Sequence, residues 1–276
     1  MTRKRRAAIL GIVAMLALYV AGVAGLYAFQ RSFLFIGAAQ LSALPPLPLG
    51  YRDLRLTASD GTPLRAWYKP PAPGKPVVLF FHGNGDTIAG SAAAVQPFTA
   101  RGYGALLPEF RGYGGMPGKP SEALVIDDAR KSHGWLTAQG IADVDIVLVG
   151  YSLGSGVATR LASEFRPRAL ILFAAFASID RVAAAKFWFM PVRLLLTEHF
   201  DNAAKLPSVA APVLLMHGTV DSVVPYDNLA VLARARPAAT VMTMPRVGHE
   251  IVFQPAVVAR ALVWLDTLSS GVKGPG

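Results

Sequence analysis

The chain opens with one long apolar segment and continues with short apolar runs that alternate with polar ones. Residues 7–29 carry no charged side chain. At 1.5 Å rise per residue, a helix over this segment spans about 30 Å, the thickness of a bilayer core. The sequence therefore predicts a transmembrane anchor at residues 7–29. A buried helix of a soluble domain is disfavoured, because such helices usually show a polar face.

The charges before this segment predict its orientation. Four consecutive basic residues stand at positions 3–6, so residues 1–6 are expected to stay in the cytoplasm. The rest of the chain is then periplasmic or otherwise extracytoplasmic, in a single-pass protein of a bacterial inner membrane. The competing interpretation is a secretory signal cleaved near Gly22-Val23-Ala24. A retained anchor is favoured because the apolar run continues beyond that site to Phe29.

Residues 30–50 are predicted to link the anchor to a folded domain. Their first part is still apolar and is expected to lie along the membrane surface or to pack on the domain. The stretch Leu44-Pro45-Pro46-Leu47-Pro48 cannot be helical, because proline removes backbone donors and clashes within a helix. It is therefore expected to be short and stiff.

From residue 51 onward, strand-like and helix-like segments alternate. Candidate strands are 52–57, 64–69, 76–81, 104–108, 145–149, 169–173, 212–216 and 239–244. Candidate helices are 87–101, 121–139, 153–165, 227–235 and 252–270. Continuous apolar runs such as VVLFF suit strands that are buried on both faces of a parallel sheet. The pattern predicts an α/β fold over residues 51–270, with a mostly parallel eight-stranded sheet, helices on both faces, and a flexible tail at 271–276.

The first chemical candidate is a serine that follows the strand at 145–149. In Gly150-Tyr151-Ser152-Leu153-Gly154 the chain must turn sharply from strand into helix, and the flanking glycines permit that close approach. Such a turn exposes the hydroxyl of its middle residue. Ser152 is therefore the candidate nucleophile.

Two candidates for an oxyanion hole follow from this placement. The helix that starts at Leu153 points its first N–H groups toward the site. His82-Gly83-Asn84-Gly85 follows the strand at 76–81, and the N–H of Asn84 can pair with that of Leu153 to bind an oxyanion. His82 is expected to hold the loop by hydrogen bonds rather than to react.

Two further strand ends supply an acid and a base. Asp221 follows the strand at 212–216 and can orient an imidazole, although a turn-forming or capping aspartate is the alternative. His249 follows the strand at 239–244 and can act as general base. The chain order Ser152, Asp221, His249 is the one that this architecture requires.

Other polar residues are weaker candidates for these roles. The remaining acids are Glu198, Asp201 and Asp227, of which Asp201 precedes the 212–216 strand. His217 is interpreted as structural, like His82. Neither His133 nor His199 follows a predicted strand end.

Composition narrows the function classes. Hydrophobic residues make up 53% and charged residues 16%, which indicates a large core, a membrane segment or both. Cysteine is absent, so disulfides, thiolate metal sites and a cysteine nucleophile are excluded. The net charge is +10, but beyond the N-terminal cluster the basic residues are scattered, which argues against nucleic-acid binding. No histidines have metal-ligand spacing, and neither a metal nor another cofactor is expected.

Together, five motifs resemble those of the α/β-hydrolase superfamily over about residues 50–270. They are FHGNG (81–85), RGYGGMPGKPSE (111–122), GYSLGSG (150–156), HGTVDSVVP (217–225) and GHE (248–250). Within the superfamily the chain resembles the membrane-anchored bud-emergence-like proteins and the abhydrolase-domain depalmitoylases. The resemblance implies Ser152 as nucleophile, His249 as base, Asp221 as orienting acid, and Asn84 with Leu153 as the oxyanion hole. It also implies that residues 173–211 form a lid.

The expected activity is hydrolysis of an ester or thioester through an acyl-enzyme, on a small or lipid-like acyl substrate. The first alternative is a serine peptidase of the aminopeptidase or prolyl type, since such relatives share the arrangement. The second is a non-catalytic membrane scaffold, which has no need of an intact Ser-Asp-His set. Physiological substrate, acyl length and oligomeric state stay open.

Overall fold

Eight strands form one sheet in the computed structural model of the protein, which describes residues 2–39 and 46–270. Their order across the sheet is β1-β2-β4-β3-β5-β6-β7-β8. The strands are β1 (Arg52–Thr57), β2 (Pro63–Lys69), β3 (Val77–Phe81), β4 (Gly104–Pro108), β5 (Ile146–Tyr151), β6 (Ala169–Phe173), β7 (Val213–Gly218) and β8 (Thr240–Met244). Each lies within two residues of its predicted bounds.

The sheet is parallel except at one edge. β1 and β2 form an antiparallel hairpin, β2 pairs antiparallel with β4, and the remaining neighbours are parallel. In the hairpin turn, Gly61 has a φ of +82°, which glycine adopts without steric cost. All residues of β3, β4, β5 and β6 are buried, as the continuous apolar runs predict.

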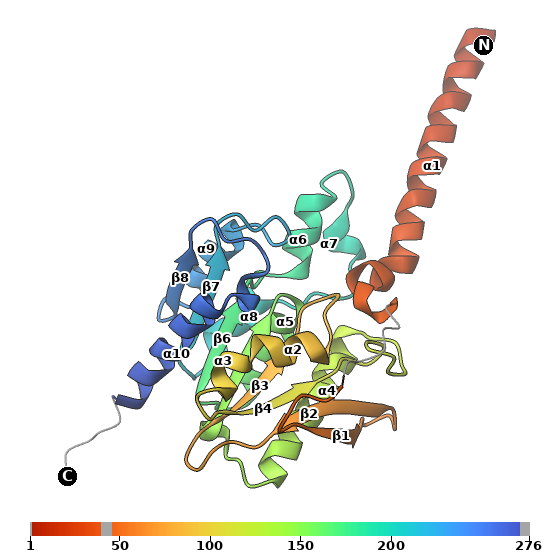
Figure 1. Cartoon of the computed structure of the whole chain (residues 1–276). Helices are drawn as coiled ribbons and strands as arrows, with labels where there is room; N and C mark the ends of the chain where they lie inside the picture. Colours follow the sequence, from red (N-terminus) through yellow and green to blue (C-terminus); the bar gives the residue numbers. More distant parts are fainter. Residues whose placement is uncertain (1, 40–45, 271–276) are drawn as a thin grey trace.

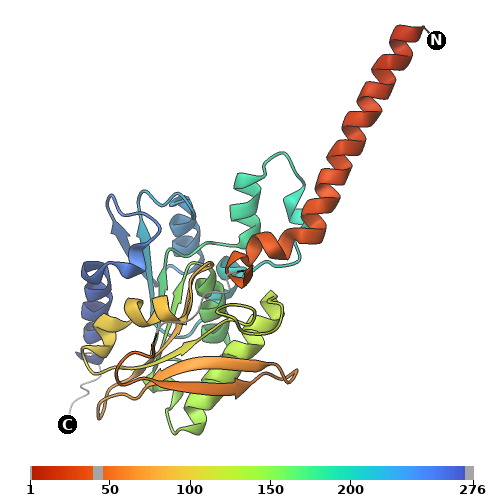
Figure 2. The same ribbon diagram turned by 45° about the vertical axis from the view of Figure 1, so that its right-hand side comes forward.

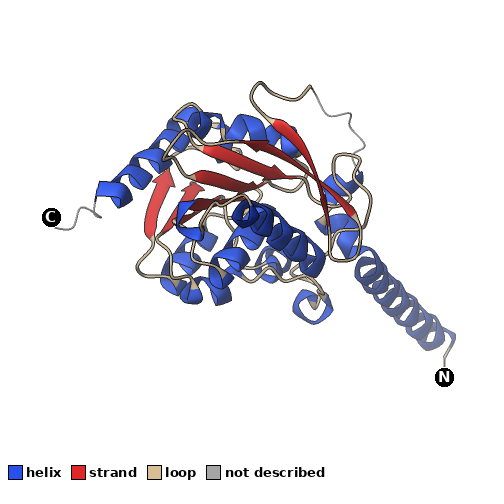
Figure 3. Ribbon diagram, turned by 90° about the horizontal axis from the view of Figure 1, so that it is seen from below, coloured by secondary structure: helices blue, strands red, loops and turns tan. Residues whose placement is uncertain are grey.

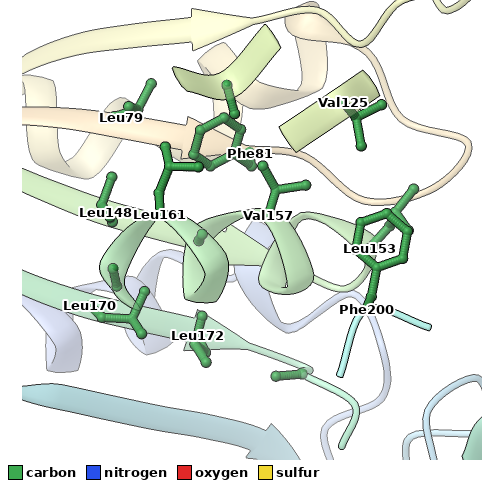
Figure 4. Packing of buried hydrophobic residues seen from close by; sticks show 14 of the residues in the cluster. Leu79, Phe81, Val125, Leu148, Leu153, Val157, Leu161, Leu170, Leu172 and Phe200 are labelled. Carbon is green, nitrogen blue, oxygen red and sulfur yellow. The ribbon is translucent and has the colours of Figure 1, made fainter. Parts of the chain in front are cut away.

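Helices cover both faces of this sheet (Figure 3). One face packs against α4 (Glu122–Ala138), α5 (Leu153–Glu164), α8 (Asn202–Lys205) and α9 (Asp227–Ala235). The other packs against α2 (Ile88–Ala94), α3 (Gln96–Thr99) and α10 (Pro255–Ser270). In Figure 4, side chains of α5 lie against those of the central strands. Each fully buried aliphatic side chain of this kind stabilises the fold by about 1.5–3 kcal/mol.

Two predicted helices are interrupted where the sequence carries proline. The segment predicted as one helix over 87–101 divides into α2 and α3, with Pro97 in the first turn of α3. The segment predicted over 252–270 has a short 3₁₀ turn, Ile251–Phe253, and then α10, which begins at Pro255. Proline fits a first helical turn, where its missing N–H has no partner to lose.

The N-terminal helix α1 (Arg3–Leu34) projects away from the domain (Figure 1). Its most apolar window has a mean hydropathy of 2.4 and none of it is buried, so by length and composition it can cross a membrane. The helix extends five residues beyond the predicted end at Phe29, into the predicted linker. Residues 36–39 form a 3₁₀ turn, whereas residues 40–45 of that linker and the predicted tail at 271–276 lie outside the described residues.

The segment 173–211, which we call the lid, contains α6 (Ile179–Lys186), α7 (Val192–Leu195), α8 and a 3₁₀ turn (Leu206–Ser208). Its first two helices stand beside the half of α1 that is nearer the domain (Figures 1 and 2). At its base Phe200 is buried and packs edge-to-face on Phe35, with ring centroids 6.3 Å apart. The lid and the end of α1 therefore share one packed junction.

Candidate active site

Ser152 stands in a sharp turn between β5 and α5. Its φ of 49° and ψ of −117° are uncommon for a residue with a side chain, so the surrounding structure must hold it there. The neighbours leave no room for larger residues: a Cβ at Gly154 would lie 2.0 Å from the Phe81 carbonyl oxygen, and one at Gly150 would lie 2.6 Å from the Gly154 oxygen. Both glycines are thus required for the turn that displays Ser152.

The structure brings Ser152, His249 and Asp221 together in one hydrogen-bonded chain. His249 Nε2 lies 3.0 Å from Ser152 Oγ, and His249 Nδ1 lies 2.8 Å from Asp221 Oδ2. A carboxylate only accepts, so Nδ1 carries the proton and Nε2 is free to accept from the serine hydroxyl. This is the tautomer that a general base requires.

The two carboxylate oxygens of Asp221 have different partners. Oδ1 accepts the backbone N–H groups of Val223 and Val224, at 2.9 and 2.8 Å. Oδ2 faces His249. One oxygen thus stabilises the turn that follows β7, and the other lies where an orienting carboxylate would act. This division fixes the carboxylate plane relative to the imidazole.

A third group near the carboxylate was missed by sequence reasoning. His217 Nε2 lies 3.3 Å from Asp221 Oδ2 and donates to the Val224 carbonyl at 3.0 Å. Burial alone would raise the pKa of Asp221, but the hydrogen bonds from His217 and His249 outweigh it and hold that pKa well below its usual range. Asp221 is therefore ionised at neutral pH. His217 lies at the end of β7 and Asp221 in the turn after it, so no periodic pattern in the sequence indicates this contact.

The HGNG loop lies directly against Ser152. A Cβ on Gly83 would lie 3.4 Å from Ser152 Cβ and 2.8 Å from the Tyr151 ring. The loop therefore approaches the turn at Ser152 as closely as glycine allows. Leu153, the first residue of α5, follows Ser152 directly and is buried. Asn84 follows Gly83 in the loop that lies against Ser152, and its proposed role in an oxyanion hole stays a prediction.

The side chain of Asn84 has a separate role that the sequence did not indicate. Its Oδ1 accepts from the Tyr113 hydroxyl at 2.7 Å and from the Gly37 N–H at 3.5 Å. Its Nδ2 donates to the carbonyl of Leu34, the last residue of α1. The loop next to Ser152 is thus tied to the end of the N-terminal helix.

His82 holds the same loop from inside, in agreement with the structural role predicted for it. Its Nδ1 donates to the Gly83 carbonyl at 2.8 Å and its Nε2 lies 2.9 Å from Glu109 Oε1, with both side chains fully buried. Burial alone would lower the pKa of His82, but the hydrogen bond and charge of Glu109 reverse the shift, which is upward. Glu109 also accepts the N–H of Ile88, at the start of α2. Sequence reasoning did not single out Glu109.

The alternative acids have partners elsewhere. Asp201 accepts the Ala204 N–H as the cap of α8, Asp227 pairs with Arg181, and Glu198 pairs with Arg31 at 2.6 Å. Among the other histidines, His133 bonds Asp143 and stacks on Phe165, and His199 bonds Asp180. Within residues 2–39 and 46–270, no group of three or more His, Asp or Glu side chains is arranged to hold a metal.

A mostly parallel eight-stranded sheet with a serine in a strand-to-helix turn defines the α/β-hydrolase fold. Among solved structures, an α/β hydrolase from Vibrio vulnificus matches with a TM-score of 0.70 at 21% identity, covering 88% of this chain and 92% of that one. An esterase from Pyrococcus furiosus matches with a TM-score of 0.64 at 18% identity, covering 85% and 96%. These likenesses confirm the predicted fold.

Sequence comparison gives the family. The family described as serine aminopeptidase, S33, matches residues 72–203. An uncharacterized protein of Mycobacterium tuberculosis, Rv2307c, is 37% identical and covers 89% of each chain. The α/β hydrolase domain-containing protein WAV2 of Arabidopsis thaliana is 29% identical over 83% of this chain and 84% of its own. The lysophosphatidylserine lipase ABHD12 of Danio rerio is 28% identical over 65% and 51%. The chain belongs to the α/β-hydrolase superfamily, and it is a hydrolase.

Proposed function

We propose that the protein is a membrane-anchored serine hydrolase that cleaves esters or thioesters. The observation that carries the proposal is the continuous chain of hydrogen bonds from Ser152 through His249 to Asp221. Ser152 acts as nucleophile, His249 as general base and then acid, and Asp221 as the orienting carboxylate. The N–H groups of Asn84 and Leu153 bind the oxyanion.

The reaction proceeds in two halves. His249 Nε2 takes the proton of Ser152 Oγ as that oxygen attacks the carbonyl carbon, and the carbonyl electrons move onto its oxygen. Each oxyanion donor stabilises this intermediate by about 3 kcal/mol. When the intermediate collapses, the bond to the alcohol or thiol breaks and His249 protonates the leaving group. Water then attacks the acyl-enzyme by the same steps and restores Ser152.

We further propose that α1 anchors the domain on the outer side of a bacterial inner membrane. The apolar window of α1 and the basic residues at 3–6 support this orientation. Residues 7–29 span the bilayer, residues 1–6 stay in the cytoplasm, and the hydrolase domain at 51–270 lies outside. A fusion of alkaline phosphatase or a fluorescent protein to the C-terminus tests the topology, because only the phosphatase works in the periplasm.

A fluorophosphonate probe tests the nucleophile, because it modifies activated serines covalently. The full-length protein in detergent is expected to be labelled, and Ser152→Ala to remove the label. Ser163→Ala is the matched control, since Ser163 lies in the same helix and bonds the Arg160 carbonyl instead of His249. Equal labelling of wild type and Ser152→Ala contradicts the proposal.

Peptide hydrolysis is the second candidate, and it is favoured by the serine aminopeptidase family that matches residues 72–203. An aminopeptidase must hold the positive α-amino group of its substrate. A cavity of about 480 Å³, whose lining includes Asn84 and Val223, is mainly apolar. Its only charged lining residue among the described ones is the positive Lys186. We therefore favour acyl esters. Rates on p-nitrophenyl esters and on aminoacyl p-nitroanilides distinguish the two candidates, and turnover of neither favours a scaffold.

A further inference from the structure

A cavity of about 480 Å³ lies between the end of α1, the lid and the HGNG loop. α1 contributes Leu26, Tyr27 and Phe33, and the lid contributes Val182, Ala183 and other apolar residues of α6 and α7. The volume falls within the range of about 300–1,000 Å³ that is typical of ligand sites. The cavity thus has one wall from the lid and one from α1.

The cavity borders the two loops that lie next to Ser152 and Asp221. Asn84 lines it, and the adjoining Gly83 abuts Ser152. Val223 also lines it, and its N–H donates to the carboxylate of Asp221. An apolar chain in the cavity therefore lies beside the loops that hold Ser152 and Asp221.

The size of the cavity fits one hydrocarbon chain. An apolar cavity of about 150 Å³ holds one benzene molecule, so a cavity of 480 Å³ holds roughly three times as much, or about 18 carbons. This is about the size of one long acyl chain. The cavity can therefore hold one acyl chain of a substrate.

The wall that α1 provides is fixed to the lid by polar contacts. Gln30 Nε2 donates to the Leu195 carbonyl at 3.2 Å, and Gln30 Oε1 accepts the Thr197 N–H at 2.9 Å. One residue further on, Arg31 Nε lies 2.6 Å from the buried Glu198 carboxylate. These contacts hold α1 against the lid. The cavity therefore keeps its shape only while the helix is docked there.

If residues 7–29 span a bilayer, the tip of the lid lies at membrane depth. The Tyr19 hydroxyl donates to the Phe189 carbonyl at 3.1 Å, and Tyr19 lies about 15 Å along the helix from Phe29, the outer end of the proposed span. Around this contact Trp188, Phe189 and Leu194 are 82%, 52% and 86% exposed. If α1 spans the bilayer, these side chains face lipid, which removes the cost of their exposure to water.

We propose that the cavity binds one acyl chain of an ester drawn from the outer leaflet, which enters between α1 and the lid. The substrate is thus an acyl ester of the membrane, and α1 is part of its binding site as well as an anchor. The proposal rests on the proposed function, because it supplies the substrate of that same serine. Beyond the proposed function, this proposal assigns the pocket that determines acyl-chain length and the route by which the substrate enters.

A pair of phenylalanine substitutions tests the pocket. Ala183→Phe fills the cavity, whereas Ala185→Phe places the same ring on an exposed position of the same helix that does not line it. We expect Ala183→Phe to lower the ratio of kcat/KM for p-nitrophenyl palmitate to that for the acetate by about tenfold or more, since one methylene alone changes binding by about tenfold. Ala185→Phe should leave the ratio as in wild type.

The outcomes separate the two proposals. An unchanged ratio in Ala183→Phe, with hydrolysis that still requires Ser152, overturns the pocket and leaves the proposed function standing. A wild-type protein that hydrolyses neither ester overturns the proposed function first. A lowered ratio in both variants also counts against the cavity, because a ring outside it would then have the same effect.

Tryptophan quenching tests entry from the membrane. The full-length protein is placed in phosphatidylcholine vesicles that contain brominated lipid, which quenches tryptophans in contact with acyl chains. Trp67 and Trp264 are buried in the domain, and Trp135 in α4 is half-buried against Tyr68. Quenching is therefore expected mainly from Trp188 and should be lost in Trp188→Phe. Equal quenching of wild type and Trp188→Phe places the lid tip outside the bilayer and overturns the route from the leaflet. A pocket that passes the ester test would then take its substrate from solution.

Discussion

The side-chain amide of Asn84 donates a hydrogen bond to the main-chain carbonyl of Leu34, where α1 ends. Asn84 thereby links two parts of the protein with different tasks: the proposed membrane helix and the loop that flanks Ser152. The Tyr113 hydroxyl, which donates to Asn84 Oδ1 at 2.7 Å, holds the amide from the other side. The position of the loop N–H groups therefore depends on the docking of α1.

Replacement of Asn84 by alanine tests this dependence. Asn84→Ala keeps the backbone N–H that we propose for the oxyanion hole and removes the contacts that position it. We expect kcat on p-nitrophenyl acetate to fall by at least about tenfold with little change in KM, because a misplacement of about 1 Å can cost 10²-fold. Steady-state kinetics measure kcat and KM separately.

Tyr113→Phe is the graded control, because it removes one contact of Asn84 and keeps the others. Its effect on kcat should be in the same direction and smaller. If Asn84→Ala changes only KM, or lowers the unfolding temperature with kcat intact, the side chain serves the fold or the substrate pocket and does not position the loop.

The orienting role of Asp221 is tested by its isosteric amide. In Asp221→Asn the amide nitrogen can donate toward His249, which moves the imidazole proton to Nε2 and leaves no acceptor for the serine hydroxyl. We expect kcat to fall by about 10⁴-fold, as in serine hydrolases with the corresponding change. The rate of fluorophosphonate labelling should fall with it. His217→Gln should have a much smaller effect, since His217 contacts the carboxylate but not His249.

Sequence reasoning placed the strands and the serine turn well because both depend on local pattern. A run such as Val77–Phe81 is apolar throughout because both of its faces are covered, and this is visible without a structure. The turn at Ser152 needs small neighbours, and Gly150 and Gly154 indicate it in the sequence. The prediction failed inside 87–101, where Pro97 was a visible signal of a new helix start that the apolar pattern outweighed.

The contacts missed by sequence reasoning join residues far apart in the chain. Glu109 and His82 form a buried pair across two loops, and Asn84 reaches Leu34 from fifty residues away. A buried polar residue has no periodicity, so its partner cannot be read from spacing. The same holds for the cavity at the end of α1, which exists because Gln30 meets the lid at Leu195.

Two glycine-to-alanine changes in helices should have opposite effects on stability. A Cβ at Gly156 would lie 2.5 Å from Phe200 Cδ1, and that ring is buried against Phe35, so it cannot move freely. Gly156→Ala should lower the free energy of unfolding by about 1–3 kcal/mol through overpacking. Gly134 lies exposed in α4 with nothing within 4 Å of an added Cβ, so Gly134→Ala should raise it by about 0.5–1 kcal/mol.

Denaturant unfolding of the detergent-solubilised protein, followed by circular dichroism, measures both changes. A stable Gly156→Ala variant would mean that Phe200 can shift without cost, and the junction between the lid and α1 would then be looser than its packing indicates. Gly134→Ala controls for the general gain of helix propensity, which acts in both variants.

Glu164 makes a pH-dependent contribution to stability. Its carboxylate accepts from Arg130 at 2.8 Å and from Arg160 at 2.6 Å. The hydrogen bond from Arg130 is the main cause that lowers the pKa of Glu164 from 4.5 to about 2. Burial opposes this shift, and the hydrogen bond from Arg160 adds to it. A carboxyl whose pKa is lower in the folded state stabilises the fold above its unfolded pKa. The contribution should therefore be complete above about pH 4.5 and be lost as the pH falls toward 2.

Glu164→Gln tests this window. The three side chains are 25–37% exposed, so solvent screening limits the contribution to about 0.5–1 kcal/mol. Glu164→Gln should be less stable than wild type by that amount at pH 7, and the difference should shrink between pH 4.5 and 2. It should also shrink at pH 7 in 1 M salt, where charges are screened beyond about 3 Å. A difference that stays constant on acidification would show that glutamine harms the fold sterically, because the contribution of a charge pair must fade as Glu164 is protonated.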